Sequence, residues 1–290
     1  MTQSQDRPSL QPIVLGACPL CHGTSFHDFA VYPDLTWVQC ECALIYKRSE
    51  VPDPAAAQFY ESGYFGEGVQ GRRYTSRTGR RVRKSRNQIL DLLNFAPPGP
   101  LLDIGCSVGY TLRAARGLGL AATGSDLSQY AITNCRTQGF RAELGELSQL
   151  PFADGEFALV TMKHVLEHTP EPRSALREVR RVLRPGGGLF IAIPHAGYAK
   201  AMRAPQASRY YLPAAHGREH FVYYTPRTLT RLIEEEGMRV VAVNPQLLHR
   251  HAGALRRAGE MLVAPARAAA QALADALRLR KEFWLVAVRA

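Results

Sequence analysis

The feature that most limits the fold is an apolar segment, LLDIG, followed at once by a glycine turn and a helical pattern at 101–117. Gly105 and Gly109 carry no Cβ, so the chain can turn tightly there and its backbone can approach a ligand. Asp126 ends the next apolar segment, at a distance that suits one strand–helix–strand unit. In an open parallel sheet both positions lie at the carboxyl edge, where ligands bind. Alternatively, this is a plain strand-to-helix turn, and Asp126 caps the next helix.

Short apolar segments alternate with helical patterns through the rest of the chain. Such alternation is typical of strand–helix–strand units that build a parallel sheet covered on both faces. We therefore predict an α/β fold with a doubly wound, mostly parallel seven-stranded sheet, into which the last strand can insert antiparallel. The expected strands lie at 101–105, 120–126, 141–145, 157–162, 188–194, 238–243 and 283–289, with helices near 108–117, 128–137 and 172–183.

The glycine spacing indicates which ligand the turn can hold. The pattern is Gly-x-x-x-Gly rather than the Gly-x-Gly-x-x-Gly of dinucleotide-binding turns, and it lacks the Gly-Lys-Ser/Thr ending of a P-loop. A carboxylate such as that of Asp126 can accept hydrogen bonds from both hydroxyls of a ribose. These observations favour a nucleoside without a phosphate chain.

Four segments, LLDIGCSVG, GSDLS, GELSQLPFADGEFALVTMKHVLEH and VRRVLRPGGGLFIAIP, resemble in sequence and order the motifs of class I S-adenosylmethionine-dependent methyltransferases, over about residues 100–245. The resemblance implies a Rossmann-like fold that binds S-adenosyl-L-methionine. By the same resemblance, Asp103, Gly105 and Gly109 would border the methionine part of the cofactor. The implied cofactor-binding positions in these motifs are Asp103, Gly105, Cys106, Gly109, Asp126, Leu127, Glu146, Leu147 and Lys163.

Other roles also follow from this resemblance. Asp126 would bind the ribose hydroxyls, Leu127 would pack on the adenine, and the backbone of Leu147 would contact the adenine. Lys163 and His164, just past the fourth strand, would close over the cofactor. Amino-methylating enzymes carry Asn/Asp-Pro-Pro-Tyr/Phe after that strand, whereas this chain has Thr-Met-Lys-His, which argues against that class.

A hydroxyl or carbon nucleophile usually needs a base, and histidines are the first candidates. His164 and His168 of the HVLEH segment are four residues apart and would share one helical face. That spacing also allows a metal site, but the resemblance assigns HVLEH to the framework, with the first histidine near the cofactor. We therefore expect His168 to be structural and keep His164 as a catalytic candidate.

The segment with Glu219 and His220 is the stronger candidate for the base. It resembles the Glu-His segment of bacterial deoxysugar C-methyltransferases and related small-molecule O-methyltransferases, in which Tyr-x-Glu-His supplies the base, although Gly217 replaces that tyrosine here. We predict His220 as general base with Glu219 beside it. Alternatively His220 only orders the loop or caps a helix, and His195 or His216 is the base.

Four of the six cysteines form two close pairs, Cys18-Pro-Leu-Cys21 and Cys40-Glu-Cys42. In a reducing compartment such pairs indicate metal binding rather than disulfides. Their separation predicts a zinc ribbon in which four thiolates surround a structural Zn²⁺. The second pair is one residue shorter than usual, so a histidine, His22 or His27, could replace one thiolate; alternatively the cysteines are free thiols.

The predicted organisation has three parts. They are a zinc-ribbon-like module at 1–50, a linker and basic helical segment at 51–98, and a methyltransferase domain at 99–290.

An aromatic run after the cysteines contains Tyr60 and Tyr64. In the sugar enzymes that the chain resembles, a tyrosine in this run touches the cofactor. Both tyrosines are candidates for that role, and we assign it to Tyr64; alternatively they only pack in a hydrophobic core.

The net charge of +11 is concentrated in two segments, 72–86 with eight basic residues and no acid, and 249–281. The first segment could bind a phosphorylated or nucleotide-linked acceptor, RNA phosphates, or only solvent. A basic amphipathic helix at 265–280 could lie on an anionic membrane or pack on its own domain or a second copy. No run reaches the ~20 apolar residues of a membrane span and no secretory signal is visible, which predicts a cytoplasmic protein.

Together these patterns predict methyl transfer from S-adenosyl-L-methionine to an oxygen or carbon of a small, sugar-like or secondary-metabolite acceptor. Two other classes remain open. Some rRNA methyltransferases also begin with a Cys-Pro-Leu-Cys-His zinc module, but stacking aromatics are sparse in the basic segment. The third possibility is a scaffold that binds the cofactor without turnover. The patterns leave the oligomeric state open.

Overall fold

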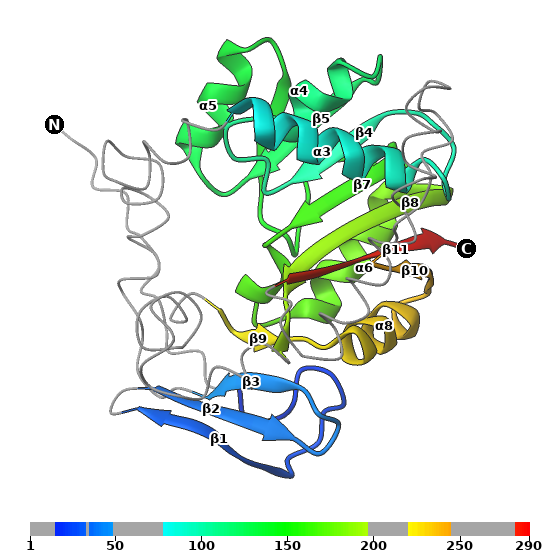
Figure 1. Ribbon diagram of the computed structural model, residues 1–290. Helices are drawn as coiled ribbons and strands as arrows, with labels where there is room; N and C mark the ends of the chain where they lie inside the picture. The colour runs from blue at the N-terminus through cyan, green and yellow to red at the C-terminus, as the bar shows by residue number, and fades with distance from the viewer. Residues whose placement is uncertain (1–14, 33–34, 49–77, 197–219, 245–281) are drawn as a thin grey trace, which may run out of the picture.

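Seven of the strands form one sheet in the computed structural model, in the order β10-β11-β8-β7-β4-β5-β6 (Figure 1). The structure describes residues 15–32, 35–48, 78–196, 220–244 and 282–290. The five central and outer strands from β8 to β6 are parallel, and β11 is antiparallel to both of its neighbours. The strands are β4 (Leu101–Ile104), β5 (Ala122–Asp126), β6 (Arg141–Leu144), β7 (Phe157–Lys163), β8 (Leu183–Pro194), β10 (Met238–Val243) and β11 (Glu282–Arg289).

Helices cover both faces of this sheet, which confirms the doubly wound α/β prediction. Strand β8 shows why: Phe190 and Ala192 face a core shared with α3 and α4, while Leu189, Ile191 and Ile193 face a core shared with α6 and α8. A strand buried on both faces has to be apolar at nearly every position. The helices are α3 (Thr78–Leu92), α4 (Tyr110–Arg116), α5 (Gln129–Thr137), α6 (Pro172–Val182) and α8 (Pro226–Glu235).

Two local expectations were wrong. The strand expected at 188–194 begins earlier, at Leu183, with an irregular stretch in which Gly186 has a φ of 74° and the pairing with β7 jumps from Leu183 to Gly188. The HVLEH segment forms only one turn of 3₁₀ helix, η2 (Leu166–His168), and His164 has a left-handed φ of 54°. The amide of His164 still donates to Ala192, so the β7–β8 ladder holds this residue outside any helix. His164 and His168 therefore share no helical face.

The cysteine segment forms a second, four-stranded antiparallel sheet in the order β1-β2-β3-β9 (Figure 1). Its strands are β1 (Phe26–Tyr32), β2 (Leu35–Cys40) and β3 (Ile45–Arg48), and its fourth strand, β9 (Val222–Tyr223), comes from far along the chain. Cys18, Leu20 and Tyr46 join Leu229 and Met238 in one continuous core with the main sheet. The predicted limits of the three parts stay a prediction; α3, within the predicted linker, packs on α4 and β8.

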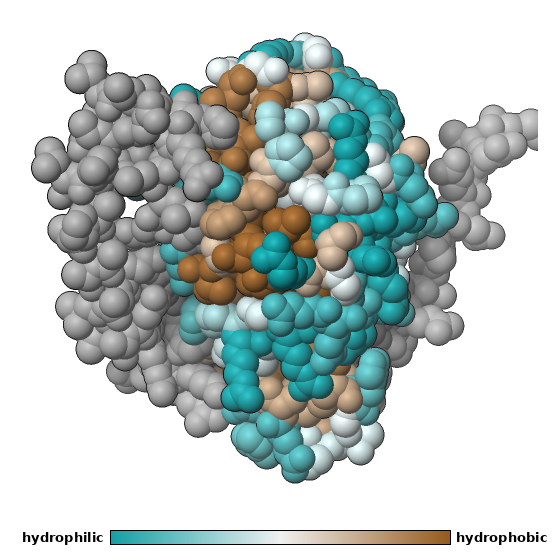
Figure 2. All heavy atoms as spheres, turned by 90° about the vertical axis from the view of Figure 1, so that its right-hand side faces the viewer, coloured by the Kyte–Doolittle hydropathy of each residue, from teal (hydrophilic) through white to brown (hydrophobic). Residues whose placement is uncertain are grey.

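The two edges of the main sheet present different surfaces. In Figure 1 the parallel strands point to the left, while β11 points to the right. Figure 2 shows the molecule from the right-hand side of that view, where apolar atoms gather in the middle of a largely hydrophilic face. The cavity that holds the predicted site residues lies at the other, carboxyl edge. Among the described helices, none combines the length and the apolar character needed to cross a membrane.

Candidate active site and cysteine cluster

A cavity of about 880 Å³ opens at the carboxyl ends of β4, β5 and β7. Most of the sequence-predicted positions line it, so the fold brings together residues from five separate segments. They are Asp103, Gly105, Cys106, Asp126, Leu127, Glu146, Leu147, Lys163, His164 and His220. Gly109 lies just behind the wall, at the start of α4. Tyr64 and Glu219, with Tyr60, His216 and the segment 265–280, lie outside the described residues.

The glycine turn has the conformation that its sequence predicts. Gly105 has a φ of 69°, and a Cβ built there would lie 2.4 Å from Cγ2 of Val165. Gly109 has a φ of 80° and precedes the first turn of α4. Both positions therefore require glycine, one because of a close approach and a left-handed backbone, the other because of its backbone. The bare backbone at Gly105 forms part of the cavity wall.

Asp126 is fixed by two backbone amides. Its carboxylate accepts hydrogen bonds from the amides of Ser107 and Ser128, each at 2.9 Å. Burial raises the pKa of Asp126, while these bonds act in the opposite direction. The cap of helix α5 is the hydroxyl of Ser128, which accepts from the Ala131 amide, so the alternative of Asp126 as the capping side chain was wrong. The Leu127 amide also interacts with this carboxylate. A carboxylate has about four acceptor sites, so it keeps some capacity for a ligand.

The adenine end of the predicted site is apolar and open. The side chain of Leu127 is 59% exposed although it is large and hydrophobic, and it lines the cavity beside Asp126. Glu146 and Leu147 line the same end. An exposed apolar side chain on a cavity wall is suited to cover a flat aromatic ligand.

Lys163 and Asp103 form a buried pair under the glycine turn. The lysine Nζ lies 3.9 Å from Oδ1 of Asp103 and donates to the hydroxyls of Ser85 and Thr111. Asp103 also accepts a 2.6 Å hydrogen bond from Thr161. Burial raises the pKa of Asp103 and lowers that of Lys163, and each group opposes the shift of the other.

Three histidines surround one buried carboxylate, that of Glu167. His164 Nδ1 lies 3.4 Å and His168 Nε2 4.0 Å from Oε1 of Glu167, and ligand atoms of Glu167, His168 and His220 all lie within 4.8 Å of one another. The side chain of Glu167 is only 1% exposed, and neither of its oxygens accepts a hydrogen bond of good geometry from the part of the chain that the structure describes. Groups of these kinds can share a proton or hold a cation. The sequence pattern assigned no role to Glu167, which lies within the HVLEH segment.

His220 and His164 differ in charge because their surroundings differ. Burial lowers the pKa of His220 to about 3, and the nearby His168 acts in the same direction, so its imidazole is neutral. Burial also lowers the pKa of His164, but Glu167 and Glu282 outweigh it and raise the pKa to about 9. The Nε2 atom of His164 lies 3.0 Å from Glu282. His220 Nδ1 lies 3.3 Å from the Tyr223 hydroxyl, and its ring meets His168 edge to face.

Of the two alternative bases named from the sequence, His195 and His216, only His195 falls in the described chain. Its ring packs edge to face on Phe283, at 5.3 Å between ring centres. Its backbone forms an isolated β-bridge with Tyr224. His195 is absent from the residues that line the cavity. This position favours His220.

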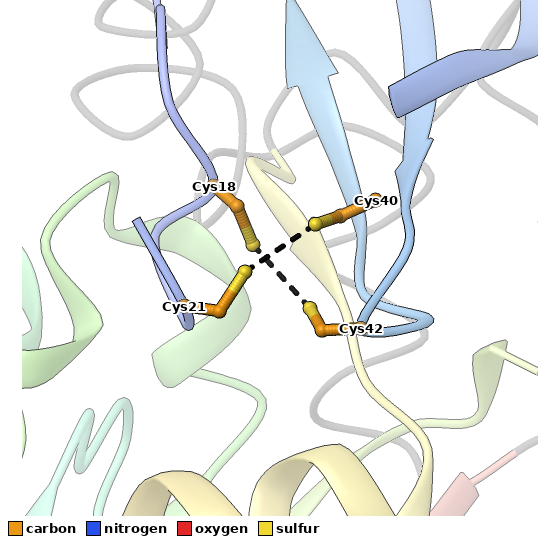
Figure 3. Close-up of side chains that lie close together, drawn as sticks. All are labelled: Cys18, Cys21, Cys40 and Cys42. Carbon is orange, nitrogen blue, oxygen red and sulfur yellow. Dashed lines mark hydrogen bonds between the residues drawn. The ribbon is translucent and has the colours of Figure 1, made fainter. Parts of the chain in front are cut away.

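The four cysteines of the second sheet point toward one centre (Figure 3). The Sγ atoms of Cys18 and Cys42 are 3.6 Å apart, and those of Cys21 and Cys40 are 3.4 Å apart. All four thiol sulfurs lie within 4.8 Å of one another, and none is in a disulfide. The cluster is complete without His22 or His27, so the shorter second pair needs no histidine.

A doubly wound sheet of this strand order, with a glycine turn facing a fixed carboxylate across one cavity, defines the class I S-adenosylmethionine-dependent methyltransferases. The family model described as "Methyltransferase domain" matches residues 74–243, and the chain belongs to this family. The family identifies S-adenosylmethionine as the cofactor.

Curated relatives cover parts of the chain. It is 28% identical over 149 residues to "Ubiquinone biosynthesis O-methyltransferase" of Thiobacillus denitrificans, covering 48% of this chain and 63% of the relative. It is 35% identical over 121 residues to "Uncharacterized 37.1 kDa protein in transposon TN4556" of Streptomyces fradiae, covering 39% and 35%. The chain thus spans between about a third and two thirds of the length of these relatives.

Solved structures share the fold. A methyltransferase of Mesorhizobium loti described as S-adenosylmethionine dependent is matched with a TM-score of 0.50 and 20% identity, over 71% of this chain and 98% of that one. A chain from the complex between the Haloferax volcanii Trm112 methyltransferase activator and a methyltransferase is matched with a TM-score of 0.50 and 17% identity, over 75% and 96%.

Proposed function

We propose that this protein transfers the methyl group of S-adenosylmethionine to an oxygen of a small acceptor of the sugar-like or secondary-metabolite class. One observation carries the proposal: a single cavity joins the glycine turn and Asp126 at one end to the neutral imidazole of His220 at the other. The curated relatives named as O-methyltransferases support oxygen as the methylated atom.

The residues at the first end fit the cofactor. The Cβ-free wall at Gly105 admits a close ligand, Asp126 is a fixed carboxylate that can accept from a ribose, and Leu127 can cover an apolar ring. When bound, S-adenosylmethionine supplies a methyl carbon that is already electrophilic. The protein's own tasks are then to align the acceptor, exclude water and take up the acceptor's proton.

His220 is the proposed base, as a neutral imidazole beside a buried anion. The Tyr223 hydroxyl lies at Nδ1, which leaves the other ring nitrogen to accept the acceptor's proton. The carboxylate of Glu167 acts against burial and raises the pKa of His220, so it offsets part of the cost of the imidazolium that forms. Glu219 precedes His220 and is proposed as its helper, and His164 as a further group at the cavity wall.

The acceptor is proposed to carry a phosphate, as a nucleotide-linked or lipid-linked sugar does. Arg81 and Lys84 of the basic helix α3 line the cavity, and a guanidinium can bind a phosphate through two parallel hydrogen bonds. Substitution of Arg81 by Gln is expected to raise KM about tenfold for the phosphorylated acceptor only. RNA as the acceptor would show instead a steep loss of binding with salt.

The deciding experiment is a screen for cofactor-dependent methyl transfer to nucleotide-sugars, lipid-linked saccharides, unphosphorylated sugars and RNA. On the acceptor found, His220→Ala should lower kcat by about 10²–10⁴-fold while calorimetry shows unchanged affinity for S-adenosylhomocysteine. His27→Ala, at an exposed position of β1, is the control and should keep the wild-type rate. A full rate in His220→Ala would refute the base assignment.

A neutral histidine accepts a proton without a metal ion, so the proposed mechanism needs no cation at Glu167, His168 and His220. Brief treatment with EDTA that does not remove metal from the cysteine cluster should therefore leave the rate of methyl transfer unchanged. Loss of activity that Mg²⁺ or Mn²⁺ restores would instead assign Glu167, His168 and His220 to cation binding.

We also propose that the four cysteines bind one structural Zn²⁺. Tetrahedral Zn–S bonds of about 2.3 Å place sulfurs roughly 3.8 Å apart, close to the separations of the two cysteine pairs. Four protein ligands leave no open position for catalysis. Metal analysis should give one zinc per chain, lost in Cys18→Ser and kept in Cys135→Ser, since Cys135 lies in α5.

A further inference from the structure

The residue that follows His220 is held from two sides by backbone hydrogen bonds. The Phe221 carbonyl accepts from the amide of Lys47 in β3, at 2.8 Å, and the Phe221 amide donates to the carbonyl of Glu167, at 2.7 Å. Strand β9 continues this contact, with Tyr46 opposite Val222 and Ile45 opposite Tyr223. We call the described residues 15–32 and 35–48 the cysteine module. The backbone beside His220 therefore lies between the sheet of the cysteine module and the loop that carries Glu167.

Side chains reinforce the same contact. Trp37 of β2 packs on Tyr223 with 4.8 Å between ring centres, and Tyr223 is the residue whose hydroxyl lies at His220. Val222 is fully buried in the core that contains Cys18 and Cys40. Arg173 of α6 donates to the carbonyl of Leu20, in the first cysteine turn, and pairs with Glu236 at 2.7 Å. The module is thus tied to the main domain next to the site.

Strand β9 depends on the module for its shape. It has two residues, and its ladder within the described chain is the one with β3. So short a strand forms only where a neighbouring sheet holds it, because even an isolated two-stranded hairpin is marginal in water. The cofactor end is held differently: Asp126 takes its hydrogen bonds from Ser107 and Ser128 of the main domain.

We propose that the cysteine module is a positioning element for His220: through β3 it fixes β9, and so sets the imidazole against Glu167 and His168 at the acceptor end of the cavity. The proposal rests on the proposed role of His220 as base. Loosening the module, or removing its metal, should then lower kcat and leave cofactor binding intact. The module acts through the histidine and touches no reacting atom.

A proline at position 47 tests this contact directly. In an antiparallel sheet the N–H and C=O of one residue point to the same neighbour, so the Lys47 amide bonds only to the β9 side. Lys47→Pro deletes the hydrogen bond to Phe221 and spares the ladder with β2. Lys47→Arg is the matched control, since it keeps the N–H and the cation that lies 5.3 Å from the centre of the Phe221 ring.

In Lys47→Pro we expect one zinc per chain and wild-type affinity for S-adenosylhomocysteine. The hydrogen-exchange rate of the Phe221 amide should rise at least tenfold. The kcat should fall at least tenfold, with little change in KM. Lys47→Arg should behave as wild type in all four. Faster exchange at Phe221 with an unchanged kcat would overturn the proposal.

Metal removal from the wild-type protein gives a second measurement if the proline variant loses zinc. The Phe221 amide should lose protection and regain it on reloading with Zn²⁺, in step with kcat, while the Val160 amide of β7 stays protected. Protection at Phe221 that survives metal removal would overturn the proposal. Failure of the base assignment is distinguishable, because it shows in His220→Ala activity and leaves the exchange result unaffected.

Discussion

Lys163 Nζ lies 3.9 Å from Oδ1 of Asp103, and this contact joins the ends of the neighbouring parallel strands β7 and β4 beneath the glycine turn. Asp103 is 2% exposed. Removing one partner of a buried ion pair leaves the other charge without compensation. The pair therefore connects β4 and β7 below the cofactor end of the cavity. Substitution of either side chain should greatly lower the free energy of unfolding.

Substitution of Asp103 by Asn should lower the free energy of unfolding by about 3 kcal/mol, because Lys163 loses its countercharge. Lys163→Met should cost a similar amount. The double variant should cost clearly less than the two single changes together, since no unpaired charge remains. Urea unfolding of all four proteins measures this coupling, and strictly additive losses would contradict it.

The second prediction concerns Asp126. Asp126→Asn keeps the shape of the side chain but loses the negative charge that we expect to accept the ribose hydroxyls, so affinity for S-adenosylhomocysteine should fall about 10–100-fold. The control is Glu143→Gln on β6, which breaks surface pairs with Arg136 and Arg141. Calorimetric titration compares the two, and equal affinities would remove Asp126 from the ribose site.

Gly105 and Gly119 allow backbone strain to be separated from a clash. Both have positive φ, but a Cβ at Gly119 meets nothing within 4 Å, whereas one at Gly105 meets Val165. Gly119→Ala should cost about 1 kcal/mol of stability. Gly105→Ala should cost about 1–3 kcal/mol more and weaken cofactor binding, and a second change, Val165→Ala, should recover much of the loss. No recovery would place the defect in the backbone alone.

The fourth prediction is a pH dependence of stability. Glu167 and Glu282 outweigh burial and raise the pKa of His164 to about 9, above its ordinary value of 6.5. A group whose pKa is higher in the folded state contributes stability that is complete below pH 6.5 and is lost as the pH rises through about 9. His164→Asn tests this, since asparagine tolerates the left-handed backbone.

The stability difference between wild type and His164→Asn should be constant between pH 4.5, the ordinary pKa of the partner Glu282, and pH 6.5, and should shrink toward pH 9 in chemical unfolding. Glu282→Gln should make this dependence weaker, because it removes one of the two carboxylates at His164. A difference that grows with pH would contradict the assignment.

The main sheet and the cofactor end could be predicted from the sequence because their signals are local. Apolar strands, the glycines at 105 and 109, and the acid at 126 each lie within one strand–helix–strand unit, and the chain order fixes which strand ends meet. The cysteine cluster was predictable for the same reason, since each pair is a short turn. The roles of Gly105, Gly109 and Asp126 in cofactor binding, and of the cysteines in zinc binding, stay predictions.

The acceptor end could not be predicted in the same way. The four-residue spacing of His164 and His168 suggested a helix, but the β7–β8 ladder continues to the His164 amide and prevents it. The central place of Glu167 depends on His220, which comes from another part of the chain. The pairing of β3 with a two-residue strand has no sequence signal at all, because so short a strand shows no periodicity.

Strand β9 lies far downstream of the sheet that it completes, and this affects how a nascent chain assembles. The cysteine turns leave the ribosome long before Val222, and at 5–20 residues per second the interval is on the order of ten seconds. Through that interval the outer edge of β3 lacks its partner strand β9. Chaperone contact or rapid metal capture during synthesis would protect that open edge from pairing with a neighbouring polypeptide.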